Sequence, residues 1–469
     1  MLCGLLLLAS TALAPQQQAA DTRPRRPNIL FAIADDWGWP HAGSYGDRVV
    51  KTPTFDRLAA EGVRFEAAFV SSPSCTPSRN AILTGQDFFR LGEGADLWST
   101  LAPEHEVFPA MLAAAGYHVG HWRKAWGPGD WTAAGRKVDP AGPGFTSFAA
   151  FLDARPKGAP FCFWLGASDP HRPYREGSGE ANGIDPGAVS VPPPFPDAPE
   201  IRSDIADYYN AVQRFDRDVG EAVELLRSKG ELDDTLVVIT GDHGWPFPRG
   251  KTNLYDLGVR VPLAVRFGSR LRAGTVITDL VTLTDLAPTF LDLAGVDVPA
   301  AMTGASLMPM LRGDKGAKAR DHVVFGRERH TIAQHDHEGG YPMRAVRTSR
   351  YLLIRNFRPD DWPAGWEAPG DRPFRDCDNG PTKTWLIEHR SLFPRAFELC
   401  FGKRPALELY DMESDPWQLD DLAADAGHAE LRGELEALLD RELVRLADPR
   451  HSGEVVPSFD AAPYRGSKR

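Results

Sequence analysis

Residues 28–34 read Asn-Ile-Leu-Phe-Ala-Ile-Ala, an apolar run that begins after Pro27 and ends at Asp35-Asp36. Runs of this kind are typical of strands that are buried on both faces, as in a parallel sheet. Helical patterns separate this run from later ones, and the alternation predicts an α/β fold with a large, mostly parallel sheet flanked by helices. The later runs of the same character are residues 117–122, 161–165 and 236–240.

Helices are predicted between these runs. One starts at Thr52-Pro53 and ends at Gly62, and a second covers residues 107–115. The longest is expected to begin at Ser203, which suits an N-cap, and to end before Gly230. Its apolar side chains recur at three- and four-residue steps, which predicts one face packed on the sheet.

Each of the four predicted strands is followed closely by polar residues with metal-binding or catalytic potential. Parallel strands present their carboxyl ends at one edge of a sheet, and ligands bind beyond that edge. We therefore expect a single site there, formed by Asp35, Asp36, Lys124, Asp169, His171, Asp242 and His243.

The pattern changes after about residue 315. A hairpin, a further strand and a closing helix predict a smaller unit of antiparallel sheet plus one helix, whereas residues 358–400 are expected to be an ordered irregular surface segment. The predicted organisation is a signal peptide at 1–20, the main α/β domain at 24–315, the α+β subdomain at 316–450 and a tail at 451–469. The hairpin strands are residues 343–348 and 351–357, the further strand is 407–412 and the helix is 430–446.

Composition excludes several classes of protein. The 469 residues are 42% apolar, which is enough to bury a core and excludes wholesale disorder. Lys and Arg number 53 against 64 Asp and Glu, a formal net charge of −11. Such a chain lacks the broad positive field that nucleic-acid binding requires, although a local basic cleft can still take an anionic substrate.

The first residues resemble a secretory signal. Residues 5–14 are apolar or small, polar Gln16 to Gln18 follow, and the run is too short to cross a bilayer. Because no Lys or Arg precedes the run and Pro15 follows it directly, a wrongly assigned start or an unstructured tail is the alternative. We expect export to the periplasm or the cell exterior, and no later apolar stretch is long enough for a membrane helix.

The cysteines lack the dense spacing of a disulfide scaffold or zinc site, and Cys3 would leave with the signal. Cys162 lies in an apolar run and is expected to be a buried, inert thiol. Cys377 and Cys400 could pair in an oxidising compartment, and the spacing leaves this open.

Cys75 differs because it lies at the expected start of a helix. Ser74 suits the N-cap, Pro77 is tolerated in the first turn, and Gly85 ends the helix. The positive end of the helix dipole favours negative charge beside Cys75, and Arg79 lies on the same helix face. Taken alone, this stretch is explained equally well by a half-buried, packed cysteine.

Residues 75–79, Cys-Thr-Pro-Ser-Arg, resemble the C-x-P-S-R signature of the type I sulfatases, a formylglycine-dependent branch of the alkaline phosphatase superfamily. The resemblance covers nearly the whole mature chain and implies an alkaline phosphatase-like fold and sulfatase activity. Its other motifs are Pro-Asn-Ile-Leu at 27–30 with Asp35-Asp36, Thr-Gly-Asp-His-Gly at 240–244, and Leu-Tyr-Asp at 409–411 with Asp415-Pro416.

Other stretches resemble the heparan N-sulfatase (sulfamidase) branch, which implies a sulfated glucosamine substrate such as heparan sulfate fragments and a role in glycosaminoglycan degradation. The position of the sulfate and the choice between an N–S and an O–S bond stay open. These stretches are Asp-Pro-His-Arg at 169–172, Trp-Pro-Phe-Pro at 245–248, Thr-Asn-Leu-Tyr at 252–255 and Tyr-Pro-Met-Arg at 341–344.

The resemblance implies a role for Cys75. A separate formylglycine-generating enzyme would oxidise it to an aldehyde, whose hydrate attacks sulfur and forms a covalent sulfated intermediate. The second hydroxyl of the hydrate would then expel sulfate. The resemblance also implies one Ca²⁺ per chain, held by Asp35, Asp36, Asp242 and His243. Relatives carry Asn or His at the position of His243, and imidazole is a softer ligand than an amide oxygen.

The remaining implied roles concern the sulfate and the substrate. Arg79, Lys124 and Lys251 would bind the anion, and such preorganised charge is typically the largest catalytic contribution. His171 would protonate the leaving group. The other implied substrate contacts are Asp169, His330, His335 and Arg344, although a surface loop that happens to be rich in histidine explains the last three equally well.

One position departs from the family pattern, because Trp126 stands where many sulfatases carry a His two residues after the equivalent of Lys124. Tryptophan cannot accept a proton, so either another base, such as Asp36 or water, assists sulfate release or turnover is altered. Two alternatives therefore stay open: a phosphonate or phosphodiester hydrolase of the same superfamily, and a sulfoglycan-binding pseudoenzyme with unmodified Cys75. The oligomeric state is not indicated.

Overall fold

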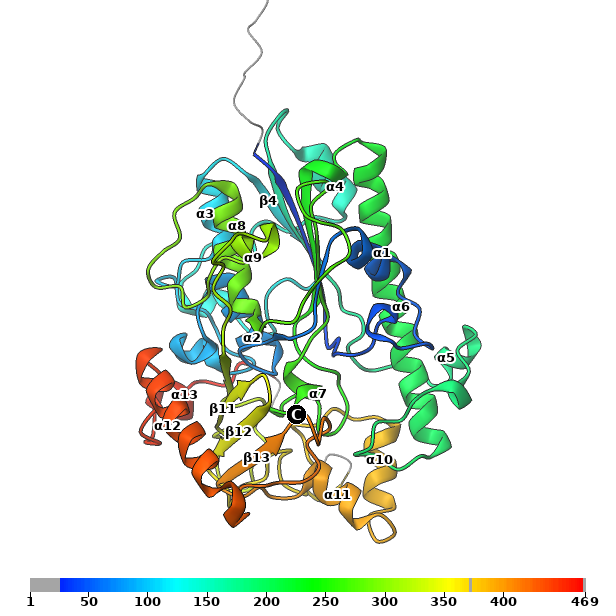
Figure 1. Cartoon of the computed structure of the whole chain (residues 1–469), viewed down its shortest axis with the longest axis vertical. Coiled ribbons are helices and arrows are strands. Elements are labelled where there is room, and N and C mark those ends of the chain that lie inside the picture. Colours follow the sequence, from blue (N-terminus) through cyan, green and yellow to red (C-terminus); the bar gives the residue numbers. More distant parts are fainter. Residues whose placement is uncertain (1–25, 371–372, 467–469) are drawn as a thin grey trace, which may run out of the picture.

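The computed structural model describes residues 26–370 and 373–466, so the predicted signal peptide lies outside the described residues. A seven-stranded sheet forms the centre of the larger unit (Figure 1). Its strands, in spatial order, are β4 (His118–Trp122), β5 (Phe161–Gly166), β1 (Asn28–Ala34), β6 (Thr235–Gly241), β7 (Leu263–Arg266), β2 (Val63–Phe65) and β8 (Thr275–Ile277).

The first four strands in this order run parallel, which confirms the predicted fold class, and β7 is antiparallel to both of its neighbours. All seven residues of β1 are buried. Ile29, Phe31 and Ile33 enter one apolar core, whereas Leu30 and Ala32 enter the core on the opposite face. This two-residue alternation explains why the strand is apolar throughout.

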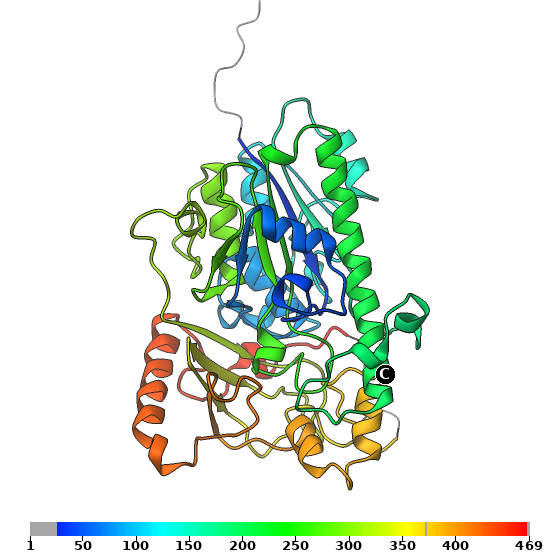
Figure 2. The same ribbon diagram turned by 45° about the vertical axis from the view of Figure 1, so that its right-hand side comes forward.

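Helices cover both faces of the large sheet (Figure 1). One face packs against α2 (Cys75–Thr84), α3 (Phe108–Ala114), α8 (Leu286–Ala294) and α9 (Met308–Arg312). The other packs against α1 (Pro53–Glu61), α4 (Phe148–Ala154) and α6 (Pro199–Ser228). Figure 2 shows α6 running the length of this face and reaching α10 (Pro381–Glu388), against which it packs.

The predicted N-cap of α6, Ser203, is wrong by five residues. The helix begins at Pro199, with Ala198 as the N-cap, because proline fits the first turn, where its missing N–H leaves no hydrogen bond unmade. The prediction of an irregular segment at 358–400 is also wrong in part, because α10 and α11 (Pro394–Phe401) lie there.

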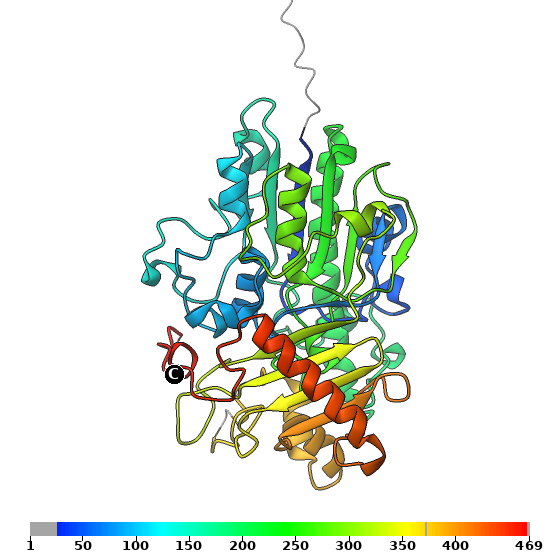
Figure 3. The ribbon, with the colours of Figure 1, turned by 60° about the vertical axis from the view of Figure 1, so that its left-hand side comes forward.

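The smaller unit contains an antiparallel sheet in the order β10 (His322–Arg327), β11 (Met343–Thr348), β12 (Tyr351–Asn356) and β13 (Leu407–Asp411). The hairpin, the last strand and the closing helix are confirmed, whereas β10 was not predicted. The helix, α12 (Ala429–Arg445), lies across this sheet (Figure 3) and buries Leu435, Leu439 and Leu443. The predicted domain boundary at 315–316 falls in the connection between α9 and β10.

The remaining features are short. Within the described part of the chain, Cys75, Cys162, Cys377 and Cys400 are buried and unpaired, so the structure shows no Cys377–Cys400 disulfide. No described helix has the length and apolar character needed to span a membrane. The remaining described strands and α-helices are β3 (Ala68–Phe69), β9 (Val281–Thr282), α5 (Ser178–Ala181), α7 (Asp256–Val259) and α13 (Pro457–Asp460).

Candidate active site

The polar residues that follow β4, β5, β1 and β6 meet at one edge of the large sheet, because these four parallel strands are direct neighbours. The register pairs Ala34 with Gly241, and the amide of Asp242 donates to the carbonyl of Ala34 at 3.1 Å. The amide of Asp35 donates to the carbonyl of Asp169 at 3.0 Å. Backbone pairing thus continues past the strands and holds the loops of the site together.

Cys75 occupies the first turn of α2 and is 2% exposed. Its Sγ lies 3.3 Å from Nε2 of His243 and 3.7 Å from Oδ1 of Asp35. Burial raises the pKa of the thiol to about 12, against the pull of Lys124 and Lys251. The side chain is therefore a neutral thiol at neutral pH, which is a poor nucleophile in this form.

A candidate metal site surrounds the thiol. Ligand atoms of Asp35, Asp36, Cys75 and His243 all lie within 4.8 Å of one another, and all four residues are buried. Oδ1 of Asp36 has no hydrogen-bond partner and lies 3.2 Å from Nε2 of His243. A buried carboxylate oxygen without a partner is costly unless a cation meets it, so the donor set fits a divalent metal ion.

The backbone of Asp36 and the side chain of Asp242 support this arrangement. Asp36 has φ of 73°, a left-handed conformation that non-glycine residues rarely adopt and that clusters at functional sites. Its amide donates to Oδ1 of Asp242 at 2.9 Å, while Oδ2 of Asp242 accepts from Nε of Arg79 at 2.8 Å. Asp242 therefore joins the predicted set while also holding Arg79 in place.

Three cationic side chains converge on the acidic cluster. Nζ of Lys124 lies 2.6 Å from Oδ1 of Asp35, Nζ of Lys251 lies 3.0 Å from Oδ2 of Asp36, and a terminal nitrogen of Arg79 lies 3.5 Å from Oδ1 of Asp35. Burial would raise the pKa of Asp35, but Lys124, His171 and Arg79 together lower it well below its ordinary value. The carboxylate of Asp35 is thus ionised, and the cations are held where an anion can bind.

His171 lies on the open side of this cluster, with about a third of its side chain exposed. Its Nδ1 contacts the carbonyl of Arg172, and its Nε2 lies 3.9 Å from Oδ2 of Asp36. The carboxylate of Asp169, by contrast, pairs with Arg214 at 2.8 and 2.5 Å. Asp169 joins the site through its backbone carbonyl, while its side chain is engaged with α6.

His330 is brought to the site and His335 is not. Nδ1 of His330 lies 2.9 Å from Oγ of Ser74, which accordingly makes no side-chain capping bond to α2. Burial, Lys251 and Arg327 lower the pKa of His330 well below its ordinary value, so the ring is neutral. His335 is exposed and packs edge-on against Trp366.

The prediction that Arg344 contacts substrate is wrong. The residue is fully buried, and its guanidinium pairs with Asp448 and Glu328 at 2.6 and 2.7 Å and donates to two backbone carbonyls. With every donor nitrogen engaged and no surface exposed, Arg344 has no capacity to bind a ligand. Its role is to join β11 to the segment that follows α12.

Asp378 is the residue of the site that sequence reasoning missed. Its Oδ2 lies 3.1 Å from Nζ of Lys251, and it forms a second compact cluster with Asp36 and His171. It lies in the segment expected to be irregular, where neither periodicity nor a motif singles it out. An open cavity of about 250 Å³ adjoins it, lined by Thr331, Arg375, Cys377, Asp378 and Asn379.

Trp126 does not replace the missing histidine. Its indole nitrogen donates to Oδ1 of Asn80 on α2 at 2.7 Å, and its ring packs against the apolar core. The side chain thus serves to hold the Lys124 loop against α2.

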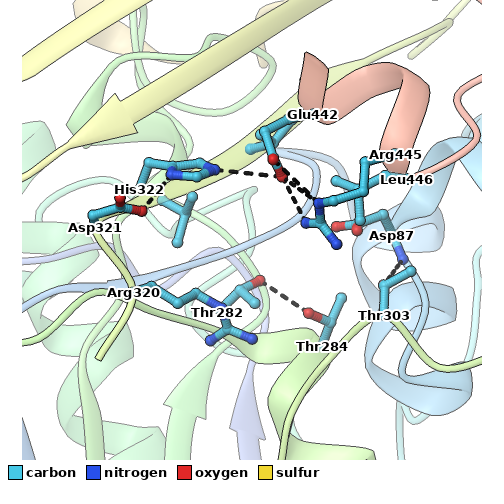
Figure 4. A pocket seen from close by; sticks show the side chains of 12 residues that line it. Asp87, Thr282, Thr284, Thr303, Arg320, Asp321, His322, Glu442, Arg445 and Leu446 are labelled. Carbon is cyan, nitrogen blue, oxygen red and sulfur yellow. Dashed lines mark hydrogen bonds and ion pairs between the residues drawn. The ribbon is translucent and has the colours of Figure 1, made fainter. Parts of the chain in front are cut away.

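A separate polar cavity of about 130 Å³ lies between the two units (Figure 4). Glu442 of α12 pairs there with Arg445 and lies 3.4 Å from His322 of β10. The amide of Asp87 donates to the hydroxyl of Thr303, and both residues line this cavity. None of the candidate site residues lines this cavity.

The buried carboxylates, the ring of cations and the enclosed side chain at position 75 define an enzyme that acts on an anionic group at the edge of an α/β sheet. Residues 27–296 match the sulfatase family, and residues 241–366 match the family described as N-sulphoglucosamine sulphohydrolase, C-terminal. The chain belongs to the sulfatase family, whose members are hydrolases.

Several sulfatases are similar to most of the chain, and two of them are named for glucosamine sulfates. The chain is 30% identical to human N-sulphoglucosamine sulphohydrolase, over 94% of this chain and 91% of the relative. It is 25% identical to N-acetylglucosamine-6-O-sulfatase of Bacteroides thetaiotaomicron, over 93% and 89% respectively.

Two solved structures show the same fold. One is of a protein in complex with its substrate D-glucosamine-2-N,6-O-disulfate, with a TM-score of 0.64 and 22% identity over 90% of this chain and 99% of the other. The second is the phosphonate monoester hydrolase of Silicibacter pomeroyi, with a TM-score of 0.67 and 18% identity over 94% and 100%.

Proposed function

We propose that this chain is an exported, calcium-dependent sulfatase that removes sulfate from glucosamine-containing glycans, with Cys75 converted to formylglycine. One observation carries the proposal: the side chain at position 75 is enclosed between a cluster of buried carboxylates and three cations. An unmodified thiol with a pKa near 12 is a poor nucleophile there, which favours modification over thiolate chemistry.

Calcium is the proposed cation. Asp35, Asp36 and Asp242 supply the carboxylate oxygens that a hard cation prefers, and His243 supplies one nitrogen. When bound, the ion would lower the pKa of the nucleophilic hydroxyl and screen the charge of the sulfate. Oδ1 of Asp36 has no hydrogen-bond partner, which supports the presence of this ion.

The cations of the site position the sulfate. Lys124 and Lys251 reach the carboxylate cluster from two different loops. An ion pair with Asp242 holds Arg79 in position. If a sulfate bound among these three cations, its oxygens would replace the carboxylates as their partners, and the backbone would not need to move. Such preorganisation supports catalysis because no reorganisation is needed while the bond breaks.

His171 is the proposed proton donor to the leaving group. Its Nδ1 is engaged by a carbonyl, so Nε2 is the atom that faces the site. Its partial exposure places it at the entrance, where the sugar would lie. Protonation by a positioned imidazole typically contributes 10²–10⁴-fold to the rate.

The substrate class rests on the relatives. Human N-sulphoglucosamine sulphohydrolase and bacterial N-acetylglucosamine-6-O-sulfatase both carry glucosamine sulfates in their names, and both match more than nine-tenths of this chain. A formylglycine-generating enzyme would act on the chain before catalysis. Residues 1–20 are proposed to direct export.

The test is sulfate release from defined substrates after co-expression with a formylglycine-generating enzyme. N-sulfoglucosamine, glucosamine 6-O-sulfate and 3-O-sulfate, an aryl sulfate and an aryl phosphodiester would be assayed in parallel. We expect the glucosamine sulfates to be hydrolysed with the highest kcat/KM. Preference for the phosphodiester would instead identify a phosphoester or phosphonate hydrolase, and no hydrolysis of any substrate would favour a glycan-binding protein.

A further inference from the structure

Asp378 introduces negative charge beside a site built to bind an anion. Its carboxylate is about a quarter exposed and shares Lys251 with Asp36. Burial would raise its pKa, but Lys251, His171 and His330 lower it strongly, so the side chain is ionised. Because the Asp378 carboxylate repels a bound sulfate, sulfate binding does not explain why an acidic residue lies at this position.

Its position separates Asp378 from the nucleophile. Two clusters share Asp36: one contains Asp35, Cys75 and His243, and the other contains His171 and Asp378. In an in-line displacement at sulfur, the nucleophile and the leaving group lie on opposite sides of the sulfur atom. If Cys75 marks the nucleophile side, His171 and Asp378 mark the side of the leaving group.

One oxygen of Asp378 is available to a ligand. Oδ2 accepts from Lys251, whereas no residue in the described ranges donates to Oδ1. The carboxylate lines the open cavity formed with Thr331, Arg375, Cys377 and Asn379. At about 250 Å³, this cavity is smaller than the roughly 300–1,000 Å³ of pockets for drug-sized ligands, which suits a single sugar ring.

We propose that Asp378 selects a nitrogen leaving group, by pairing with the nitrogen of a sulfamate when that nitrogen is protonated for cleavage. This inference rests on the proposed sulfatase function and names the bond that the site prefers. His171 transfers one proton to the sulfamate nitrogen, which gives that nitrogen a positive charge beside the Asp378 carboxylate. The S–N bond then breaks as an S–O bond forms, and its electron pair stays on nitrogen and gives the primary amine.

Charge explains the selectivity. A sulfamate nitrogen carries positive charge once it is protonated for cleavage, and a carboxylate beside it stabilises that charge. The bridging oxygen of a sulfate ester is far less basic, takes its proton only as the bond breaks, and gains much less from the same carboxylate. Asp378 therefore distinguishes N-sulfated from O-sulfated glucosamine at the step where the two differ in charge.

The kinetic test compares D378N with the unaltered enzyme on N-sulfoglucosamine and on 4-nitrophenyl sulfate. The aryl sulfate needs Lys251 and the other sulfate contacts, but its phenolate leaves without a partner of opposite charge. We expect kcat/KM for N-sulfoglucosamine to fall roughly 10- to 100-fold, the usual value of a hydrogen bond to a charged group, and to change less than about threefold for the aryl sulfate. D361N is the matched control, because Asp361 also pairs with a histidine, His337 at 3.0 Å, outside the site.

A binding test needs no turnover. Glucosamine, whose amine is largely protonated at neutral pH, should bind more tightly than N-acetylglucosamine by calorimetry, and D378N should abolish this preference while D378E retains it.

Three outcomes would overturn the inference: an equal loss of kcat/KM on both kinetic substrates, no loss on either, or an unchanged preference for the amine in D378N. If the unaltered enzyme releases no sulfate from any substrate, the proposed function fails, and the amine preference then decides this inference by itself.

Discussion

The sulfur of Cys75 lies 3.3 Å from Nε2 of His243, although the two residues are 168 positions apart in the chain. The first turn of α2 and the end of β6 thus bring the side chain proposed to be converted and a proposed metal ligand into contact. Any group made from Cys75 would form within reach of the cation, so modification and metal binding are expected to be coupled.

Replacing Cys75 with serine tests the need for that modification. C75S keeps a hydroxyl but cannot form an aldehyde hydrate, so the sulfate ester that it forms lacks the second hydroxyl needed to expel sulfate. We expect glycan binding to survive and steady-state turnover to fall by about 10³-fold or more. Binding is measured by calorimetry and turnover by inorganic sulfate. Undiminished sulfate release by C75S would refute the role of the hydrate.

Calcium removal should lower both activity and stability. A ligand that binds only the folded state at 100 times its Kd stabilises it by about 2.7 kcal/mol, so Ca²⁺ should raise the Tm of the chelator-treated protein. In D36A this shift should disappear, because the oxygen without a protein partner is removed. A calcium-dependent Tm shift of equal size in D36A would place the ion elsewhere.

Lys124 should contribute to catalysis rather than to folding. We expect K124A to lose about 10²–10³-fold in kcat/KM, the usual effect of removing one preorganised donor. R123A is the control, because Arg123 is the adjacent residue but pairs with Asp218 on the surface. Comparable losses in both variants would indicate a general disturbance of the loop.

Asp87 should make stability depend on pH. Burial raises its pKa from 3.8 to about 6, against the pull of Ser71, Thr303 and Arg320, so the folded state binds this proton more tightly than the unfolded state. The stabilisation is present below about pH 4 and is lost as pH rises through 6, by up to about 3 kcal/mol.

D87N mimics the protonated acid at every pH. It should therefore exceed the unaltered protein in free energy of unfolding at pH 7.5 and match it near pH 4, as measured by urea titration. A residual difference from neighbouring Arg445 should be similar at both pH values, since this guanidinium stays charged. A pH-independent difference would contradict the shifted pKa.

Arg344 should affect stability rather than substrate affinity. R344A leaves Glu328 and Asp448 buried without this partner, which typically costs 3–5 kcal/mol of unfolding free energy. KM measured on the folded fraction should stay within about twofold. An increase in KM without loss of stability would restore the substrate-binding role.

The sequence predicted four of the seven strands of the large sheet, and the polar residues that follow them, because both are visible in local patterns. It did not predict β2, β7 or β8. The bounds of β1 were predicted correctly from its apolar run, and Asp35 and Asp36 were placed by the strand end itself. Parallel neighbours then carry Lys124, His171 and Asp242 to the same edge.

The parts that could not be predicted depend on contacts between distant segments. Arg344 meets Asp448, 104 residues later, and nothing in the local sequence indicates that pairing. Asp378 reaches Lys251 across 127 residues from a segment without periodicity. The short helix α10 contains Pro and Trp at positions that obscure its helical periodicity. Its packing on α6 stabilises it.

The most direct test is the number of sulfate ions released per chain from N-sulfoglucosamine, measured on two preparations whose residue 75 has been identified by peptide mass spectrometry. The account predicts many turnovers per aldehyde-bearing chain and none per thiol-bearing chain. Equal release from the thiol form, or no release from a fully converted, calcium-loaded preparation, would contradict it.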